Sequence, residues 1–306
     1  MKTKSAFIAI VGRPNVGKSS IINRLLGQKI AIVSDKPQTT RTRIMGVKTE
    51  GDAQYVFVDT PGFHKPRNTL GENMMKAVGN GLSDVDGVML VVEAKTKFDF
   101  DPDNLPIAEL ELIKEIKKRQ LKAVLVINKI DLLEDKSDML GVISAYSKLI
   151  DFESVIPVSA RSGDGINIIT EEASKWLRES VHYFDSEDVT DQSEQSMVAE
   201  MIREKLLRSL DREVPHGIAV DIERMYERDT ADGQPILEVE ATIYCEKDSH
   251  KGIVIGKGGE MLKKIGSSAR IDIEKFYGIK ASVKLWVKVK EDWRNRQGII
   301  HGFGLD

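Results

Sequence analysis

The sequence predicts an α/β domain with a mostly parallel, doubly wound sheet, followed by a smaller α+β domain. Apolar strand-like runs alternate with helical stretches from residue 6 to about residue 181. Residues 193–290 follow a different order, α-β-β-α-α-β. The intervening residues 185–192 are acidic and lack hydrophobic periodicity, which indicates a linker. We therefore expect domains at residues 1–184 and 193–306.

The composition is that of an ordinary two-domain globular protein. The 306 residues are 41% hydrophobic and 30% charged, which is enough for two separate cores. The single cysteine, Cys245, excludes an intrachain disulfide and suits a reducing cytoplasm. We expect no signal peptide, and no apolar run has membrane-spanning length. We also expect a monomer, although no feature of the sequence fixes the oligomeric state.

The first predicted strand, residues 7–11, leads into Gly-Arg-Pro-Asn-Val-Gly-Lys-Ser and then a helical stretch. This is the context of a phosphate-binding loop, because the glycines admit phosphates to the backbone and a helix N-terminus favours anions. Lys18 would neutralise the terminal phosphates, and Ser19 would offer its hydroxyl to Mg²⁺. The expected nucleotide contacts are Gly12, Arg13, Pro14, Asn15, Val16, Gly17, Lys18, Ser19 and Ser20.

A polar segment, residues 36–43, follows without core periodicity. It is the candidate first switch, a segment that GTP orders and that is released after hydrolysis. One of its threonines should complete the magnesium shell. We choose Thr40, with Thr39 and Thr42 as alternatives.

The next strand, residues 55–58, ends in Asp-Thr-Pro-Gly, a candidate γ-phosphate sensor. Asp59 would hold magnesium through a water molecule, and the amide of Gly62 would contact the γ-phosphate. The predicted metal ligands are thus Ser19, Thr40 and Asp59. The sensor residues expected at the nucleotide are Asp59, Thr60, Pro61, Gly62 and Phe63.

Two further strands end in motifs that select the base. Residues 123–127 lead into Asn128, Lys129, Ile130 and Asp131, and residues 154–158 lead into Ser159, Ala160 and Arg161. The Asp131 carboxylate can accept from the N1 hydrogen and the exocyclic amine of guanine, whereas adenine has no such donors. Asn128 would brace the loop, Lys129 would lie over the purine, and a backbone amide of the 159–161 turn would reach the guanine oxygen. Together with the two phosphate motifs, this order indicates a GTPase.

The hydrolytic group is less clear. Phe63 follows Gly62, where Ras-like enzymes carry a glutamine that orients water, and a phenyl ring cannot do this. Asn15 combined with a hydrophobic residue after the sensor glycine resembles translation-factor-related GTPases that recruit K⁺ beside the phosphates. Alternatively, Phe63 folds onto the core and Asn15 only forms a turn. The residues assigned to catalysis are Asn15, Lys18, Thr40 and Gly62, with K⁺ as a candidate activating ion.

The elements after the base motifs complete the two domains. An amphipathic helix near residues 166–181 closes the first, and we expect His182 and Tyr183 to pack as a linker edge rather than to bind nucleic acid. The second should contain a helix at 194–210, strands at 218–228 and 236–246, a long helical segment and a last strand at 280–290. In that last strand we interpret the lysines as protection of an exposed edge.

Between the two helices of the second domain lies a Gly-x-x-Gly loop, residues 256–259. Such a loop lets a single-stranded backbone approach, and it is typical of the type II KH domain in this order of elements. Residues 251–290 hold ten Lys or Arg against three Asp or Glu, which suggests a positive face. A helix-capping turn without a ligand is the alternative. The predicted RNA contacts are Ile255, Gly256, Lys257, Gly258, Gly259, Lys263, Lys264 and Arg270.

The nucleotide motifs described above, combined with the Val-Ile-Gly-Lys-Gly-Gly loop of the second domain, are similar to those of the Era family of bacterial GTPases. The resemblance covers nearly the whole chain. The resemblance implies a GTP-dependent factor for small ribosomal subunit (30S) maturation whose KH domain binds 16S rRNA near its 3′ end. It also implies peripheral association with the inner membrane, although the sequence shows no amphipathic anchor. Residues 298–304 depart from the family pattern. A GTPase supporting RNA modification and a constitutive RNA-binding adaptor are the rival interpretations.

Overall fold

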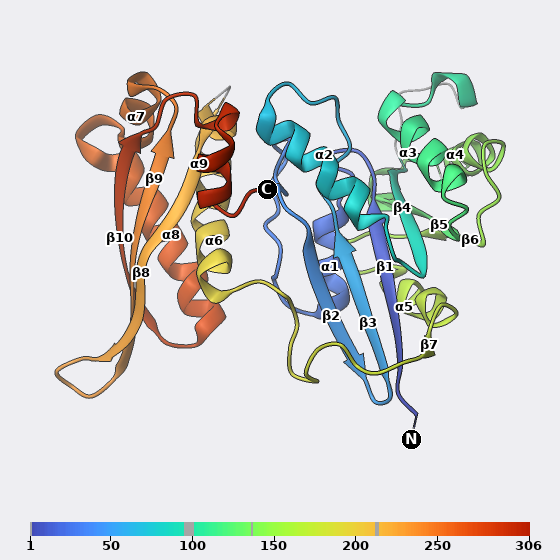
Figure 1. Ribbon diagram of the computed structural model, residues 1–306, viewed down its shortest axis with the longest axis horizontal. Helices are drawn as coiled ribbons and strands as arrows, with labels where there is room; N and C mark the ends of the chain where they lie inside the picture. Colours follow the sequence, from blue (N-terminus) through green and yellow to red (C-terminus); the bar gives the residue numbers. More distant parts are fainter. Residues whose placement is uncertain (1, 95–100, 136, 212–213) are drawn as a thin grey trace. The chain divides into compact units, whose positions relative to one another are not determined.

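The computed structural model describes residues 2–94, 101–135, 137–211 and 214–306. The chain forms two compact units (Figure 1). The first unit comprises residues 1–31, 40–67 and 71–191, and the second comprises 32–39, 68–70 and 192–306. The short segment 32–39 therefore belongs to the second unit although the chain on both sides of it belongs to the first.

The first unit is built on one sheet with the strand order β2-β3-β1-β4-β5-β6. The strands in this order are parallel except β2, which is antiparallel to β3, and the short β7 pairs antiparallel with β1 outside this order. The predicted doubly wound, mostly parallel sheet is confirmed. The strands are β1 (Lys4–Val11), β2 (Ile44–Glu50), β3 (Ala53–Asp59), β4 (Gly87–Glu93), β5 (Ala123–Asn128), β6 (Ser154–Pro157) and β7 (Arg178–Glu179).

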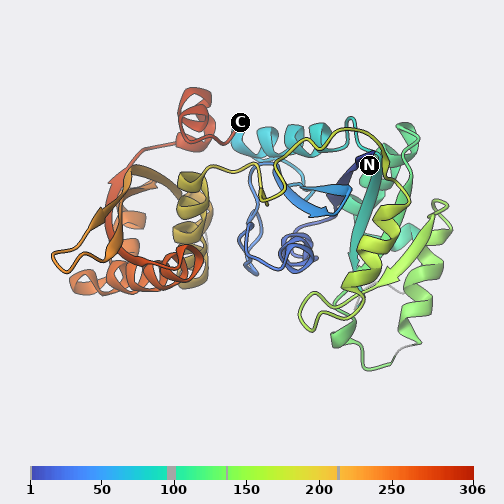
Figure 2. The same cartoon turned by 90° about the horizontal axis from the view of Figure 1, so that it is seen from below.

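Helices cover both faces of this sheet. Alternate side chains of β1 point to opposite faces: Ile8 and Ile10 join the core under α1 and α5, whereas Ala9 and Val11 join the core under α2, α3 and α4. Figure 2 shows α1 and α2 on opposite sides of the strands. The helices are α1 (Lys18–Leu26), α2 (Thr69–Gly81), α3 (Ile107–Lys118), α4 (Asp138–Ser147) and α5 (Ile166–Ser174), with short 3₁₀ turns η1 (Pro102–Asn104) and η2 (Ile130–Leu132).

The predicted closing helix at residues 166–181 is wrong in its second half. Helix α5 ends at Ser174, and Trp176 turns into the core, where its ring lies so close to Gly87 that an added Cβ would be 2.3 Å from it. The Trp176 Nε1 donates to Glu153 at 2.7 Å. The chain then extends as β7 and pairs with the start of β1. Core packing and strand pairing thus override the amphipathic pattern.

Residues 182–191 pack along the first sheet. His182 Nε2 lies 3.1 Å from the carbonyl oxygen of Asp52, and the Tyr183 ring lies edge-on to Phe7 with 5.0 Å between centroids. These contacts agree with the expected packed edge. Further on, the amide of Val47 in β2 donates to the carbonyl of Val189 at 2.9 Å. The last part of the expected linker is therefore an ordered strip beside β2.

The second unit has the predicted α-β-β-α-α-β order. Its sheet has the order β10-β9-β8, with β10 parallel and β8 antiparallel to β9. One core contains apolar residues of α6, α7, α8 and all three strands. The elements are α6 (Glu194–Ser209), β8 (Ala219–Asp229), β9 (Pro235–Cys245), α7 (Asp248–Ile255), α8 (Glu260–Tyr277), β10 (Lys280–Val289) and α9 (Gln297–Gly302), with 3₁₀ turns η3 (Val214–Gly217), η4 (Lys257–Gly259) and η5 (Trp293–Asn295).

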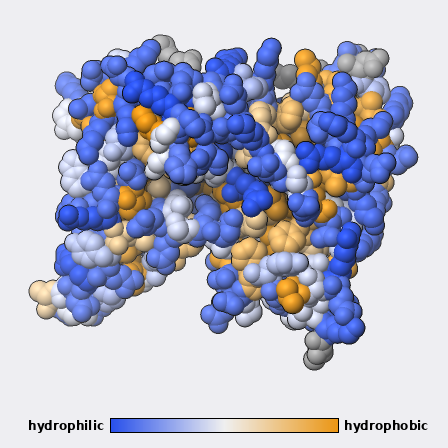
Figure 3. Space-filling model, in the orientation of Figure 1, coloured by the Kyte–Doolittle hydropathy of each residue, from blue (hydrophilic) through white to orange (hydrophobic). Residues whose placement is uncertain are grey.

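The C-terminal segment is part of the second unit. Trp293 is fully buried and its Nε1 donates to the carbonyl of Gly217 at 2.9 Å. The Phe303 ring packs on Trp293 and Tyr244, with centroids 5.5 and 5.1 Å apart. The face drawn in Figure 3 is mainly hydrophilic, with hydrophobic surface gathered over the sheet of the first unit. Among the described helices, none has the length and apolar character needed to cross a membrane.

Candidate functional site

The loop between β1 and α1 makes close backbone contacts that only glycine permits. A Cβ on Gly12 would lie 2.4 Å from the carbonyl oxygen of Val91. A Cβ on Gly17, where φ is 99°, would lie 2.2 Å from the Nδ2 of Asn128. Helix α1 begins directly after Gly17 without a side-chain cap. Its first amides therefore face the loop, which is the arrangement that binds a phosphate.

Lys18 is held inside this loop. Its side chain is buried, and its Nζ donates to the carbonyl oxygens of Gly12 and Arg13, both at 3.1 Å. Burial lowers the pKa of Lys18 to about 8, while Asp59 raises it and Arg13 lowers it further. A phosphate at this position would favour the charged amine, so the loop is electrostatically suited to an anionic ligand.

Three oxygen-bearing side chains converge beside the loop. Ser19 Oγ donates to Asp59 Oδ2 at 2.7 Å and lies 3.0 Å from Thr40 Oγ1. Thr39 does not join them, since its hydroxyl donates to the carbonyl of Lys36 at 2.6 Å. The structure thus brings together the three predicted metal ligands.

Asp59 has an unused oxygen in this cluster. Its side chain is fully buried, and no hydrogen-bond partner of its Oδ1 occurs among the residues that the structure describes. Burial raises the pKa of Asp59 to about 6, against the opposing effects of Lys18 and of hydrogen bonds from Ser19, Thr60 and Thr40. A buried carboxylate oxygen without a donor is costly, and a hard cation would satisfy it. The donor set therefore fits Mg²⁺.

The sensor loop packs directly on the phosphate loop. A Cβ on Gly62 would lie 2.7 Å from the backbone nitrogen of Pro14, and the amide of Phe63 donates to the carbonyl of Gly12 at 3.2 Å. Thr60, which is buried like Pro61, donates from its hydroxyl to the carbonyl of Ile10 at 3.1 Å. The two loops are therefore in direct contact.

Phe63 and Asn15 are the two residues whose role in hydrolysis the sequence left open. The Phe63 ring is partly buried against the core under α2, α3 and α4. Asn15 is exposed and has a left-handed backbone with φ of 66°. These observations agree with a core-packed Phe63 and a turn at Asn15.

Asn128 connects the phosphate loop to both base motifs. Its Nδ2 donates to the carbonyl of Val16 at 2.8 Å, and its Oδ1 accepts from the amide of Ala160 at 3.0 Å. This is the bracing role expected for Asn128. In the same region Asp131 is exposed, and its Oδ1 accepts from Ser159 Oγ at 2.7 Å.

The remaining predicted contacts surround these groups. Val16 is fully buried, Ser20 is half-buried on α1, and Ile130 is half-buried at the start of η2. The carbonyl of Arg161 accepts from the Nη2 of Arg24 at 3.2 Å, while the Arg161 side chain is exposed. The predicted nucleotide residues thus lie in or next to the loops that follow β1, β3, β5 and β6.

Sequence reasoning missed a set of acidic partners behind the loop. Glu93, the last residue of β4, pairs with both Arg13 and Lys129. The Nε of Arg13 also donates to Glu109 at 2.9 Å, and the hydroxyl of Tyr146 donates to Glu109 as well. Burial raises the pKa of Glu109, while Tyr146 and Arg13 lower it. In this structure Lys129 is therefore held by a carboxylate.

Two sequence features point to these partners. Glu93 ends a buried strand at the same carboxyl edge as the motif residues. Glu109 shares the helical face of Leu112, Ile113 and Ile116, all of which are buried. A carboxylate at a core position of a helix needs a partner, and Arg13 and Tyr146 provide it.

The glycine loop of the second unit is open to solvent. Gly256, Gly258 and Gly259 all have positive φ, at 74°, 59° and 82°. A Cβ on Gly256 would lie 2.7 Å from that of Met261, whereas a Cβ on Gly258 or Gly259 would meet nothing within 4 Å. Gly256 is thus needed for packing, and the other two present bare backbone between α7 and α8.

Basic side chains flank this loop. Lys257, Lys263 and Lys264 are exposed and have no ion-pair partner in the described part of the chain, whereas Arg270 donates to Glu274 at 3.0 Å. Ile255 packs against the core. By contrast, two of the β10 lysines are paired across the sheet, Lys284 with Glu240 at 3.3 Å and Lys288 with Glu223 at 3.0 Å. This agrees with an edge-protecting role for the strand lysines.

A separate pocket of about 790 Å³ lies on the first unit between the end of α2, β1, β2 and residues 178–183. Its lining includes the Phe7 and Tyr183 rings and the Arg178 and Asp86 ion pair. Arg43, the last residue of the candidate first switch, lines it, but none of the predicted nucleotide, metal or RNA contacts does. The pocket is therefore distinct from the nucleotide site.

Comparisons with known proteins agree with this geometry. A family model described as a 50S ribosome-binding GTPase matches residues 7–129, and a KH domain model matches residues 213–294. The chain is 46% identical to GTPase Era of Ruminiclostridium cellulolyticum, over 99% of this chain and 98% of that protein.

Two solved structures have the same fold over 99% of both chains. One is Era in complex with MgGDPNP and nucleotides 1506–1542 of 16S ribosomal RNA, with a TM-score of 0.91 and 33% identity. The other is an Aquifex aeolicus Era variant bound to GDP·AlF4⁻, with a TM-score of 0.90 and 32% identity. Sequence, site and fold agree over the full length: the chain belongs to the Era family of GTPases.

Proposed function

We propose that this chain hydrolyses GTP in its first unit and binds 16S ribosomal RNA near the 3′ end through its second unit, as a factor for small-subunit maturation. The observation that carries the proposal is the convergence of four motif loops on one site, in a chain that also presents the open glycine loop. The relative solved with MgGDPNP and a 16S segment supports both ligands.

Binding of GTP would use groups that are already in place. The amides at the start of α1 and the amine of Lys18 receive the phosphates, and the carboxylate of Asp131 accepts two hydrogen bonds from guanine. Lys129 would lie over the purine, either breaking its ion pair with Glu93 or keeping it. Asn128 holds the loops in register during these events because it contacts both Val16 and Ala160.

Magnesium would be held by the oxygen cluster beside the loop. We assign the hydroxyls of Ser19 and Thr40 as direct ligands and Asp59 as a ligand through water. Bound Mg²⁺ neutralises negative charge on the phosphate oxygens. The buried Oδ1 of Asp59 supports this assignment, since it has no donor among the described residues.

For hydrolysis we propose an alkali cation in place of a catalytic glutamine. Phe63 packs on the core and offers no hydrogen bond to water. Asn15 is an exposed residue of the phosphate loop, an amide oxygen is the type of ligand that K⁺ accepts, and Gly62 lies in contact with Pro14 of the same loop. Lys18, Thr40 and Gly62 then stabilise the charge that develops on the γ-phosphate.

For RNA, the bare backbone at Gly258 and Gly259 would admit a sugar-phosphate chain, and Lys257, Lys263 and Lys264 would neutralise it. Arg270 is kept beside this surface by Glu274. A cytoplasmic location, a monomeric state and a peripheral contact with the inner membrane stay predictions from the sequence and the family resemblance.

The test is crosslinking of the protein to cellular RNA in the presence of GTP or GDP, followed by sequencing of the recovered RNA. We expect enrichment of the 3′ end of 16S rRNA. Recovery of unrelated RNA at the same yield would refute the assigned partner. A GTP turnover that does not respond to the recovered RNA would favour the rival, a constitutive RNA-binding adaptor.

A further inference from the structure

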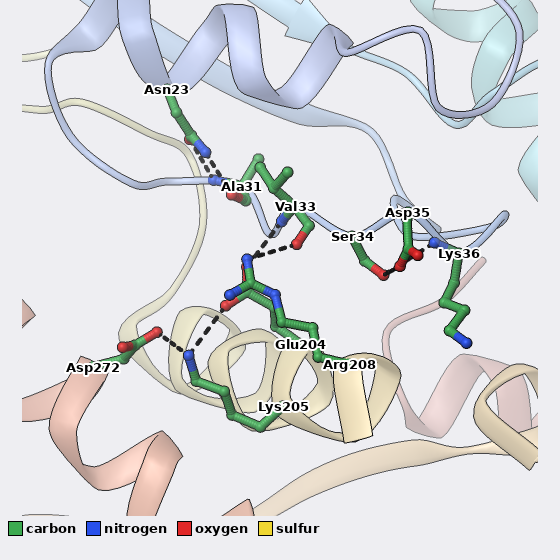
Figure 4. Close-up of polar contacts among 10 residues, drawn as sticks. All are labelled: Asn23, Ala31, Val33, Ser34, Asp35, Lys36, Glu204, Lys205, Arg208 and Asp272. Carbon is green, nitrogen blue, oxygen red and sulfur yellow. Dashed lines mark hydrogen bonds and ion pairs between the residues drawn. The ribbon is translucent and has the colours of Figure 1, made fainter. Parts of the chain in front are cut away.

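Segment 32–39, which directly precedes the proposed magnesium ligand Thr40, is bound through its backbone by helix α6. Glu204 Oε1 accepts from the amide of Val33 at 3.0 Å, and Arg208 Nη2 donates to the carbonyl of Val33 at 3.0 Å (Figure 4). Arg203 donates to the carbonyl of Thr39. Both ends of the segment are thus tied to α6, within the second unit.

The side chains that make these contacts are charged and buried. Arg203 is 2% exposed and Glu204 is fully buried. Such groups are costly inside a protein unless they are paired, and each has an ion partner: Glu200 for Arg203, and Arg208 at 3.0 Å for Glu204. The core of the second unit is served by other α6 residues, among them Val198, Ile202 and Leu206. The charged side chains of α6 therefore contact segment 32–39, while its apolar side chains form part of the core.

The segment is fixed on its N-terminal side as well. Asn23 on α1 donates to the carbonyl of Ala31 at 2.7 Å and accepts from the amide of Ala31 at 3.0 Å (Figure 4). On its C-terminal side one peptide bond separates the carbonyl held by Arg203 from Thr40, whose hydroxyl lies 3.0 Å from Ser19. The carbonyl that Arg203 binds thus belongs to the residue that directly precedes Thr40 in the chain.

Helix α6 is also joined to the helix that follows the glycine loop. Lys205 pairs with Asp272 of α8 and lies 3.5 Å from Glu204 (Figure 4). Helix α8 begins directly after Gly259, and the contacts Asp272–Lys205–Glu204 connect α8 to Val33 of segment 32–39.

We propose that Arg203, Glu204 and Arg208 are positioning residues for GTP hydrolysis: they hold segment 32–39 so that Thr40 meets Ser19 and Asp59. The Lys205–Asp272 pair connects this hold to α8. The inference rests on the magnesium site proposed above, because Thr40 has to be a ligand for its placement to matter.

The test compares Arg208→Ala with Arg228→Ala in the full-length protein. The two arginines are matched, since both side chains are about half exposed, at 52% and 48%, and both pair with a buried glutamate of the second unit. We expect Arg208→Ala to raise the Mg²⁺ concentration for half-maximal GTP hydrolysis roughly three- to tenfold, as expected for loss of a charge-assisted hydrogen bond. Affinity for GDP should change less than about twofold, and Arg208→Lys should restore part of the loss.

A second matched pair is Glu204→Gln and its control Glu238→Gln. Both glutamates are buried, at 0% and 6% exposure, and each pairs with an arginine, Arg208 or Arg228. Arg208→Ala is the informative variant if the buried Glu204 substitution does not fold, which a thermal melt would reveal. Equal Mg²⁺ dependence in Arg208→Ala and Arg228→Ala would overturn the proposal.

Two further variants separate this inference from its premises. If Thr40→Ala leaves the Mg²⁺ dependence unchanged, the magnesium assignment is wrong. If Thr40→Ala changes it and Arg208→Ala does not, only the role of α6 fails. The connection to α8 is tested with an oligonucleotide of the 16S 3′ end. It should change the Mg²⁺ concentration for half-maximal GTP hydrolysis in the parent, and this change should be at least threefold smaller in Asp272→Asn. An equal response would remove the α8 connection.

Discussion

The two candidate sites of this chain use opposite constructions. In the nucleotide site the polar groups are buried and bound to one another: Lys18 to two carbonyls, Asp59 to Ser19, and Asn128 to Val16 and Ala160. In the glycine loop Lys257, Lys263 and Lys264 are exposed, and a Cβ added at Gly258 or Gly259 would meet nothing within 4 Å.

The difference follows from the ligands that the two sites would take. A nucleotide is small, so its affinity depends on groups that are held in place before binding. A nucleic acid strand is long and flexible, and much of its affinity comes from many phosphate contacts that need no fixed geometry. We therefore expect single substitutions to act sharply in the first site and in a graded way in the second, except where the backbone itself is blocked.

The largest effect is expected at the base. Asp131→Asn replaces the acceptor of two guanine hydrogen bonds by an amide, so GTP affinity should fall at least about tenfold, with a gain for xanthosine triphosphate. Nucleotide titrations by calorimetry would measure this. The control is Asp138→Asn, an exposed aspartate in the first turn of α4. Parent-like GTP binding in Asp131→Asn would show that another residue selects the base.

The next effect concerns the backbone of the glycine loop. Gly258→Asp places a side chain and a negative charge where the RNA backbone would approach, and RNA affinity should drop roughly tenfold or more while GTP binding persists. Gly233→Asp is the control, because that glycine also has positive φ and open space around its Cα. Unchanged RNA affinity in Gly258→Asp would exclude this loop as the RNA site.

A smaller effect is expected from the alkali cation. GTP hydrolysis should be several-fold faster in K⁺ than in Na⁺ at equal ionic strength. Asn15→Ala should remove the difference and Phe63→Ala should keep it, since the Phe63 ring packs on the core. Steady-state phosphate release gives the rates. The same rate in both salts would point instead to a group supplied by a partner.

The smallest effect is a pH dependence of stability at Glu109. Burial raises the pKa of this carboxyl, so the folded state binds its proton more tightly than the unfolded state does. As the pH rises from the ordinary pKa of a glutamate through the raised pKa of Glu109 in the folded state, the parent should lose stability relative to Glu109→Gln. The loss should be about a few degrees in Tm or less. Thermal melts from pH 4 to 7.5 would test this, with Glu115→Gln of the same helix as control. A constant difference in Tm would mean that the pKa of Glu109 is the same in the folded and unfolded states.

Most of the nucleotide site could be predicted because its motifs follow buried parallel strands, and such strands bring their carboxyl ends to one sheet edge. The sequence favoured Thr40 and left Thr39 and Thr42 as alternatives, because no local pattern shows that the Thr40 hydroxyl lies beside Ser19 while the Thr39 hydroxyl donates to the carbonyl of Lys36. The pairing of Arg13 with Glu93 and Glu109 joins residues about 80 to 96 positions apart, and no local pattern encodes it.

The wrong prediction has a similar cause. Residues 166–181 have an amphipathic pattern, but the pattern contains no information on the partner of Trp176 or on the free edge of β1. In the second unit, element order and the glycine loop could be predicted from local sequence. The attachment of segment 32–39 to α6 could not, since α6 contacts backbone atoms of the segment, which every residue type has.

The position of Asn128 has a consequence for how this site can change during evolution. One amide side chain supports the phosphate loop through Val16 and the 159–161 turn through Ala160. Selection for a different base can act on Asp131. Its carboxylate is exposed and accepts a hydrogen bond from the Ser159 hydroxyl. Substitution of Asn128 disturbs phosphate and base recognition together. Libraries that seek a new nucleotide preference should therefore vary Asp131 and keep Asn128 invariant.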